Sequence, residues 1–420
     1  MREMKDSGVE WIGQIPKDWD VVPHKRVMHK VKEICVQYNG EDIISLTMNG
    51  VIKRDLAAGG KMPTSFDGYQ YVKPNDLLLC LFDIDVTPRC VGVVKDYGVT
   101  SPAYSRFIMH DGYYNAYYDY LLRAIDDDKV FVHLSKNLRS SLTESDFGAI
   151  KTCVPSLAEQ ERIAAFLDAE CAEIDAVLEK TRASIEEYKK LKQAVITQAV
   201  TKGVRGDRPM KDSGIEWIGD IPAEWNKDKV IRVFSVIGSG TTPKSSDENL
   251  FDGNTPWIQS GDINGENLFV TKNCVSNSAI ESYSALRVYQ APYLVVAMYG
   301  ASVGNLSLSM IDACVNQACC VLKKPTINLK FSFYIFKAVK DYLAQKAVGG
   351  GQPNISQETI KQLWLPIPSA DEQIEISNYL DEKCRSVDAL IAKKQQYLTE
   401  IENYKKSLIY EYVTGKKEVV

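Results

Sequence analysis

Two stretches of the chain, one over residues 157–200 and one within residues 368–413, carry apolar side chains at alternating steps of four and three residues. This spacing lines one face of an α-helix and is typical of coiled coils. The pattern therefore predicts two long helices, the first about 65 Å long at 1.5 Å per residue. The predicted seam consists of Leu167, Ile174, Leu178, Ile185, Tyr188 and Val195 in the first helix, and of Leu380, Val387, Ile391, Leu398, Ile401 and Leu408 in the second.

The residues that flank both stretches are typical of helix ends. Ser156 and Ser369 each precede a glutamate by three residues, which is the spacing of a capping box. Gly203 and Gly415 lie near the expected C-terminal ends. An isolated helix with one apolar stripe needs a partner, and the simplest partner for each helix is the other one, paired antiparallel within the chain. Pairing with a second molecule remains the alternative.

The chain also repeats itself. Residues Met4–Asp20 and Met210–Asn226 match at 12 of 17 positions, an agreement that chance does not produce. The helical blocks that begin at Pro155 and Pro368 match at a constant offset of 213 residues. Each half of the chain is therefore an opening motif, a variable segment and a long helix. A duplicated framework with two diverged segments suggests one scaffold that holds two different readers.

The variable segments, near residues 21–153 and 226–366, alternate short apolar runs with turn residues and read as strands with a few helices. Residues 229–240, for example, are expected to form a strand. The predicted fold class is α/β (α+β), with two globular domains joined by two long helices that pair as an antiparallel coiled coil, and with a pseudo-two-fold internal repeat. The predicted boundaries are residues 1–153 for the first domain (opening motif 4–20), 154–204 for the first helix and linker, 205–366 for the second domain (opening motif 210–226) and 367–420 for the second helix.

Composition and charge narrow the class of protein. The chain has 420 residues, of which 45% are hydrophobic and 25% charged, as in ordinary globular proteins. The net charge of −5 is unusual for a nucleic-acid binder, but residues 21–153 are neutral and residues 226–366 carry +3, so a local basic face remains possible. The ten cysteines form no CxxC pair and sit mostly in apolar runs. We therefore expect reduced, buried thiols in a cytoplasmic chain without a signal peptide or membrane span.

Motifs that carry catalysis are missing from the sequence. It contains no P-loop, no HExxH and no GxSxG. A glycine-containing stretch at residues 233–240 leads into a turn and not into a helix start, which speaks against a dinucleotide site. The four histidines are too scattered to suggest a zinc site. We predict no catalytic residue, no metal ligand and no cofactor bound by this chain.

Polar loops in both variable segments are the candidates for chemistry. Arginine, lysine, amide and hydroxyl side chains read base edges, and the same groups bind phosphates. In the first domain the candidate DNA-binding residues are Ser45, Thr47, Lys53, Arg54, Arg89, Ser101, Tyr104, Arg106, Lys136, Asn137, Arg139 and Ser140. In the second domain they are Thr241, Thr242, Lys244, Gln259, Ser260, Tyr299, Ser302, Asn316, Gln317, Gln352 and Asn354.

The opening motif KDSGxEWIGxIPxxW, the PxxxEQ start of each long helix and the two-unit layout resemble the DNA-specificity subunit of type I restriction–modification systems. The resemblance covers essentially the whole chain. In the second domain GTTPK, PWIQSGD, YGASVG, NQACC and GGGQPNIS are similar to turns of that family's target-recognition domains. The first domain has SKNLRSSLT where a glycine-rich loop is expected, so its loop residues match less closely.

The resemblance implies a prokaryotic, non-catalytic subunit that binds double-stranded DNA. Each of two target-recognition domains would read half of a bipartite, asymmetric site. The implied partners are two modification subunits, which carry S-adenosylmethionine and methylate adenine at N6, and restriction subunits with ATP and Mg²⁺ where such subunits exist.

Two other function classes remain open on the sequence alone. One is a coiled-coil interaction scaffold without a DNA role, and the other is an enzyme whose active site carries no familiar motif. Salt-dependent DNA binding separates the first from a DNA reader, because phosphate contacts make affinity fall with salt. Methylation or cleavage of DNA by the isolated chain would indicate the second.

Overall fold

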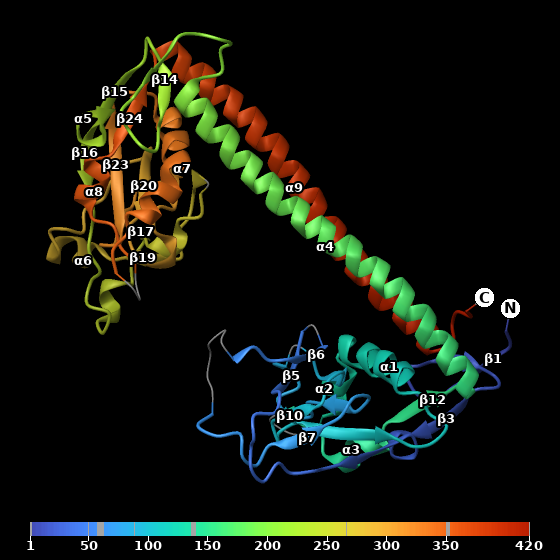
Figure 1. The fold of residues 1–420 in the computed structure, drawn as a ribbon. Helices are drawn as coiled ribbons and strands as arrows, with labels where there is room; N and C mark the ends of the chain where they lie inside the picture. The colour runs from blue at the N-terminus through green and yellow to red at the C-terminus, as the bar shows by residue number, and fades with distance from the viewer. Residues whose placement is uncertain are drawn as a thin grey trace. The chain divides into compact units, whose positions relative to one another are not determined.

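The computed structural model describes residues 2–48, 50–56, 63–87, 89–135, 140–265, 267–349 and 353–419 (Figure 1). The chain divides into two compact units. Unit 1 consists of residues 1–182 and 396–420, and unit 2 consists of residues 183–395. The division cuts both long helices, so each unit contains one variable segment together with part of each helix.

The two long helices are α4 (Leu157–Lys202) and α9 (Ala370–Val413), of 46 and 44 residues. In unit 1, Asp175 and Arg182 of α4 form ion pairs with Lys405 and Glu402 of α9, at 2.7 and 2.6 Å. As the residue number rises along α4, the residue number of its contact in α9 falls, so the two helices run antiparallel. In unit 2 the order is the same: Tyr188 meets Lys394, and Lys192 meets Asp388. The predicted antiparallel helix pair is confirmed.

The predicted seam positions lie along this contact. Leu167, Leu178, Ile185, Leu380 and Leu408 are buried, and the other seven are half-buried.

The four–three spacing also passes through polar residues, Thr181 and Lys192 in α4 and Lys394 and Lys405 in α9, and the contacts of their side chains explain why they are tolerated there. Lys192 and Asp388 form one ion pair in unit 2, and Lys405 and Asp175 form the equivalent pair in unit 1, displaced by the repeat offset of 213. Thr181 is satisfied within its own helix, because its hydroxyl donates to the carbonyl of Val177 at 2.8 Å. Because each of these polar side chains has a partner, it can lie in the contact between the two helices.

Unit 1 is built on a four-stranded antiparallel sheet in the order β4-β11-β8-β9. Four further strand pairs, β1-β2, β3-β12, β5-β6 and β7-β10, surround it. The strands are β1 (Met4–Asp6), β2 (Gln14–Pro16), β3 (Asp20–Pro23), β4 (Met28–Val31), β5 (Ile44–Thr47), β6 (Gly50–Lys53), β7 (Gln70–Val72), β8 (Leu77–Leu79), β9 (Val91–Val93), β10 (Gly98–Thr100), β11 (Ser105–Met109) and β12 (Lys151–Val154). The short helices are η1 (His24–Arg26), α1 (Asn115–Asp127), α2 (Val130–Leu134) and α3 (Glu144–Ala149).

The core of unit 1 is closed by the end of α9. Leu408, Ile409 and Val413 are at most 5% exposed and pack in the same cluster as Trp19 and Tyr117. The Tyr117 hydroxyl donates to the carbonyl of Val413 at 2.8 Å. The N-terminal globular domain thus depends on side chains almost 300 residues further along the chain.

Unit 2 is built on a mixed five-stranded sheet in the order β16-β23-β20-β21-β18, with a three-stranded sheet β19-β17-β22 beside it. The strands are β13 (Met210–Asp212), β14 (Asp220–Pro222), β15 (Asn226–Lys229), β16 (Phe234–Gly238), β17 (Thr255–Ile258), β18 (Asn267–Leu268), β19 (Asn273–Val275), β20 (Tyr293–Ala297), β21 (Leu306–Ser309), β22 (Cys314–Val315), β23 (Cys319–Pro325) and β24 (Trp364–Ile367). The short helices are α5 (Val230–Val233), η3 (Glu248–Leu250), η4 (Ser260–Asp262), α6 (Asn277–Ser282), η5 (Gly300–Ser302), α7 (Leu329–Gln345) and α8 (Gln357–Lys361).

One predicted strand is only partly a strand. Residues 230–233 form the single turn α5, and β16 begins at Phe234. A helical turn places Val230 and Val233, three residues apart, on the same face, and both are buried in the unit 2 core. Periodicity alone does not separate the two structures, because short apolar runs fit either one.

The repeated residues of the sequence make repeated contacts. The Trp19 indole N–H donates to Glu159 at 2.9 Å in unit 1, and the Trp225 indole N–H donates to Glu372 at 2.9 Å in unit 2. In both units an arginine pairs with the same glutamate. The repeated tryptophan and glutamate therefore attach each opening motif to the start of a long helix.

These contacts correct the capping-box prediction. The Ser156 and Ser369 hydroxyls accept from the backbone N–H three residues later, at 3.4 Å, as a helix N-cap should. The two glutamates, however, use their carboxylates on tryptophan and arginine in place of the second cap bond. Tertiary packing at the start of each helix offers charged and indole donors, and these are stronger partners for a buried carboxylate.

His24 makes the stability of unit 1 depend on pH. It is fully buried in η1 with its ring 4.7 Å from that of Phe147. Burial lowers the pKa of His24 from its ordinary 6.5 to about 4. Between these values the unfolded chain binds a proton that the folded unit rejects, so stability falls as the pH falls from 6.5 toward 4.

We expect the buried His24 imidazole to lower the free energy of unfolding by about 3 kcal/mol between pH 6.5 and pH 4, at about 1.4 kcal/mol per pKa unit. Denaturant unfolding at pH 4.5 and pH 7.5 checks the effect, with His24→Leu as the matched variant. The variant should lose this part of the pH dependence. Equal dependence in the two proteins would contradict the role assigned to His24.

Candidate nucleic-acid interface

Five polar segments of unit 2 form one contiguous surface, which we call the unit 2 loop cluster. It comprises residues 240–244, 259–262, 299–304, 316–317 and 353–354. The Thr242 hydroxyl donates to the Gln317 side chain at 2.6 Å, and the backbone N–H of Asn316 donates to the carbonyl of Ile258 at 3.0 Å. The N–H of Gly300 donates to the carbonyl of Pro353 at 2.8 Å. Segments separated by more than 50 residues thus lie side by side.

The sheet topology explains why these loops meet. Strands β17 and β22 pair in parallel, so the residues that follow them, Gln259 and Asn316, leave the sheet at the same edge. Ala297 at the end of β20 pairs with Cys319 at the start of β23, and Gly238 at the end of β16 pairs with Val321. The turns after β16, β17 and β20 and the turn before β23 therefore leave the sheets together.

A glycine permits the closest approach in this cluster. A Cβ atom at Gly240 would lie 1.7 Å from the carbonyl oxygen of Val315. Any other residue at this position would push the 240–244 turn away from the 316–317 turn. The glycine in GTTPK thus keeps Thr242 within reach of Gln317.

Most of the predicted residues of unit 2 face solvent in the cluster. Thr242, Lys244, Tyr299, Gln317 and Asn354 are exposed, and Thr241, Gln259, Ser260 and Ser302 are half-buried. Asn316 is the exception, because it is 8% exposed and its side-chain oxygen accepts from the N–H of Ala318 at 3.0 Å. Its role is to shape the turn. The predicted residue Gln352 lies outside the described residues.

Two residues of this surface were missed by the reading of the sequence. The Asn273 amide donates to the Gln259 side chain at 2.7 Å and so orients it. The exposed Arg287 donates to the Tyr289 hydroxyl at 2.8 Å, and this hydroxyl donates to the carbonyl of Ser239 beside the 240–244 turn. No local motif marks either position, since Asn273 reaches the cluster through the pairing of β19 with β17 and Arg287 reaches it through the Tyr289 hydroxyl.

In unit 1 the predicted residues gather around a second surface, the unit 1 loop cluster, which comprises the β5–β6 hairpin, residues 82–87, residues 101–104 and Ser140. The Thr100 hydroxyl donates to the carbonyl of Ile44 at 2.8 Å and holds the 101–104 turn against the hairpin. The rings of Phe82 and Tyr104 stack with centroids 6.4 Å apart. The N–H of Ile84 donates to the carbonyl of Ser140 at 3.1 Å.

Several polar groups of this surface already have partners. Lys53 pairs with Asp42 at 2.5 Å, and the Thr47 hydroxyl donates to the carbonyl of Gly50 at 3.0 Å. Ser45, Arg54, Ser101 and Tyr104 are half-buried. The Tyr104 phenol is protonated at neutral pH and can donate a hydrogen bond, and burial raises its pKa further.

Two arginines predicted to bind DNA are held inside unit 1. Arg106 is 3% exposed, with its Nε 2.6 Å from the Asp76 carboxylate and its Nη1 3.0 Å from the carbonyl of Tyr71. Arg89 is half-buried and lies 3.6 Å from Asp127. A guanidinium with buried partners serves the packing of the domain. Lys136, Asn137 and Arg139 lie outside the described residues.

Among the described residues, no three His, Cys, Asp or Glu side chains lie close enough to hold a metal ion. All ten cysteines are free thiols, nine of them buried. No helix formed by the described residues has the length and apolarity that a bilayer crossing requires.

Comparison with known proteins gives a consistent result. Residues 222–403 match the family model of the type I restriction modification DNA specificity domain. The chain is 23% identical to the putative type I restriction enzyme MjaX specificity subunit of Methanocaldococcus jannaschii, across 97% of this chain and 96% of that one. It is 25% identical to the MjaVIII specificity subunit of the same organism, across 65% of this chain and 63% of that one.

Solved structures share the fold. One match is a chain from a structure whose description concerns complex assembly and conformational transition of the type I R-M system. It has a TM-score of 0.73 and 15% identity, across 96% of this chain and 99% of that one. The HsdS subunit from Thermoanaerobacter tengcongensis matches with a TM-score of 0.51 and 16% identity, across 96% and 98%. With its two diverged segments and its paired long helices, the chain is similar in sequence and in fold to type I restriction–modification specificity subunits.

Proposed function

We propose that this chain reads a bipartite, asymmetric DNA site, with the unit 1 and unit 2 loop clusters each recognising one half. The observation that carries this proposal is the convergence of exposed hydroxyl, amide, lysine and tyrosine side chains at one edge of the unit 2 sheets. Such side chains match the donors and acceptors of base edges in the major groove. Because the two clusters differ in every loop, the two half-sites should differ as well.

The proposal includes partners. The chain would bind double-stranded DNA and position two modification subunits, which carry S-adenosylmethionine and methylate adenine. Restriction subunits with ATP and Mg²⁺ would join where they exist, in the cytoplasm of a prokaryote. This chain would bind no cofactor of its own and would contribute recognition and placement.

The test of this function is salt-dependent, sequence-specific DNA binding by the assembled complex. Affinity for a recognised site should fall steeply with salt, because phosphate contacts release counterions. Mapping methylated adenines in cells with and without the gene gives the site itself. A complex that binds all DNA equally, or none, would favour an interaction scaffold.

Replacing Gln317 should alter recognition by unit 2 alone. Gln317 is exposed and held by the Thr242 hydroxyl at 2.6 Å, so its amide is presented in a defined orientation. We expect Gln317→Ala to weaken specific binding by about 1–3 kcal/mol, as for a lost base contact. The half-site read by unit 1 should not change.

Methylation mapping of the Gln317→Ala variant checks this expectation. Gln362→Ala is the matched control, because Gln362 follows α8 outside the cluster and pairs with Glu358 and Lys229. If both variants keep the original sites and affinities, Gln317 does not contact DNA.

A further inference from the structure

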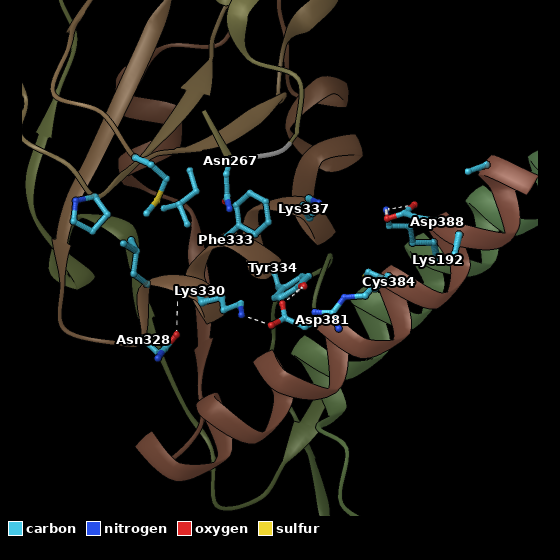
Figure 2. A pocket seen from close by; sticks show the side chains of 17 residues that line it. Lys192, Asn267, Asn328, Lys330, Phe333, Tyr334, Lys337, Asp381, Cys384 and Asp388 are labelled. Atoms are coloured by element: carbon cyan, nitrogen blue, oxygen red, sulfur yellow. Dashed lines mark hydrogen bonds and ion pairs between the residues drawn. The ribbon is translucent and has the colours of Figure 1, made fainter. Parts of the chain in front are cut away.

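Unit 2 contains a hollow of about 970 Å³ that the loop cluster does not use. Its walls come from α4, α7 and α9 and from β18 and β21, and Figure 2 shows their side chains converging on it. Phe333, Leu308 and Met310 are among its apolar lining residues. The hollow lies wholly within unit 2, because all of its lining residues fall between 192 and 392.

The rim of the hollow is basic. Lys192, Lys330, Lys337 and Arg385 line it together with two carboxylates. Lys330 pairs with Asp381, and Lys192 pairs with Asp388, as the dashed lines in Figure 2 show. Among the described residues Arg385 has no ion-pair partner, and it is exposed. The lining therefore carries a formal excess of two positive charges.

The repeat shows that this charge is not part of the common framework. In unit 1 the Tyr120 hydroxyl donates to Asp168 at 2.7 Å, and in unit 2 the Tyr334 hydroxyl donates to Asp381 at the same distance. These pairs fix which positions correspond. Four residues before the tyrosine, unit 1 has Ala116 where unit 2 has Lys330. Four residues after the aspartate, unit 1 has Ala172 where unit 2 has Arg385.

The framework thus folds with alanine at both positions, so the fold shared by the two copies does not require these cations. A solvent-facing excess of positive charge on a concave wall is suited to a polyanion. Two side-chain amides, Asn267 and Asn328, add hydrogen-bonding groups to the same lining.

Helix α7 contacts both the hollow and the unit 2 loop cluster. Lys337 lies one turn of α7 before Lys340, whose carbonyl would be 2.8 Å from a Cβ atom at Gly304. Gly304 belongs to the unit 2 loop cluster. One helix therefore forms the wall of the hollow and supports the loops that read bases.

We propose that this hollow, the basic hollow of unit 2, binds the phosphate backbone of the DNA that flanks the half-site read by unit 2. Lys330 and Arg385 provide the contacts that are specific to the second copy. This inference rests on the proposed DNA-reading function and assigns to the hollow a sequence-independent share of the affinity. Contacts of this kind position DNA without selecting its sequence.

The double variant Lys330→Ala/Arg385→Ala tests the proposal in the assembled complex, since it gives unit 2 the residues that unit 1 already has. The affinity for a recognised DNA is measured between 50 and 200 mM salt. Losing two phosphate contacts should lower the slope of log affinity against log salt by about 1.8. Binding should weaken to the same extent for recognised and unrelated DNA, and the methylated sequence should stay the same.

Lys393→Ala is the matched control, because Lys393 is an exposed lysine of α9 that does not line the hollow. If wild-type complex binds DNA specifically while the double variant keeps the wild-type slope, the inference is wrong and the proposed function stands. A double variant that reads a different sequence also overturns it. If the wild-type complex shows no salt-dependent binding, the proposed function itself fails. Should the double variant unfold, Arg385→Gln alone gives the same comparison with an expected slope change of about 0.9.

Discussion

A fragment that ends at residue 204 is expected to form dimers and to have no stable folded monomer. It lacks Leu408, Ile409 and Val413, which are buried in the core of unit 1. Removing a large aliphatic side chain from a core costs about 2–5 kcal/mol. Losing three of them approaches or exceeds the whole stability of an ordinary domain, about 5–15 kcal/mol.

A second copy of the fragment can replace what is missing. At the repeat offset of 213, Val195, Ile196 and Val200 correspond to the three absent residues, and in the full chain they pack against the core of unit 2. The α4 helix of one copy can therefore close the core of the other. Such a dimer carries two unit 1 loop clusters, so we expect it to read a palindromic version of one half-site.

Analytical ultracentrifugation and circular dichroism at micromolar concentration check this prediction. The control is the same fragment with Ile196→Asp and Val200→Asp, which removes the replacement side chains and should abolish both dimer and fold. A well-folded monomer of the unmodified fragment would show that unit 1 does not need the end of α9.

Lengthening both long helices by one heptad should lengthen the spacer between the half-sites by about three base pairs. Seven residues add about 10.5 Å of helix at 1.5 Å per residue, and DNA advances about 3.4 Å per base pair. Helices α4 and α9 each run without a break from one unit into the other. Insertions after Thr181 and after Lys394 preserve the seam, because seven residues keep its positions on the same face.

The ion pairs on either side of the two insertion points show what a seven-residue insertion should preserve. Asp175 with Lys405, and Lys192 with Asp388, lie outside both insertion points and should keep their ion pairs. Insertions of three or four residues rotate the seam and should reduce activity without giving a longer spacer. Methylation mapping reads out spacer and half-sites together. An unchanged spacer with full activity would mean that the helices do not set the distance.

The long helices and the repeat could be predicted from the sequence because both depend on local pattern. Apolar steps of four and three place side chains such as Leu178 and Leu380 on one helix face whatever the rest of the chain does. The two opening motifs are alike because each must place a tryptophan, Trp19 or Trp225, against the first turn of a helix. The absence of catalytic motifs and the presence of polar loops were also visible in residue types alone.

Which polar residues face solvent could not be predicted in the same way. Arg106 was an attractive DNA-binding candidate, but Asp76 and the carbonyl of Tyr71 hold it inside unit 1. Residue type states what a side chain can donate or accept, and only its neighbours decide whether those groups are already used.

The sequence by itself determined the helices, the duplication and the class of residues in the loops, because each follows from periodicity or identity within a short stretch. Tertiary structure decided the rest. Parallel pairing of β17 with β22 brings Gln259 to Asn316, and the end of α9 supplies Val413 to a core that begins at Ile12. These contacts join residues tens to hundreds of positions apart. They depend on burial and strand pairing summed over a whole domain, which no local stretch of sequence contains.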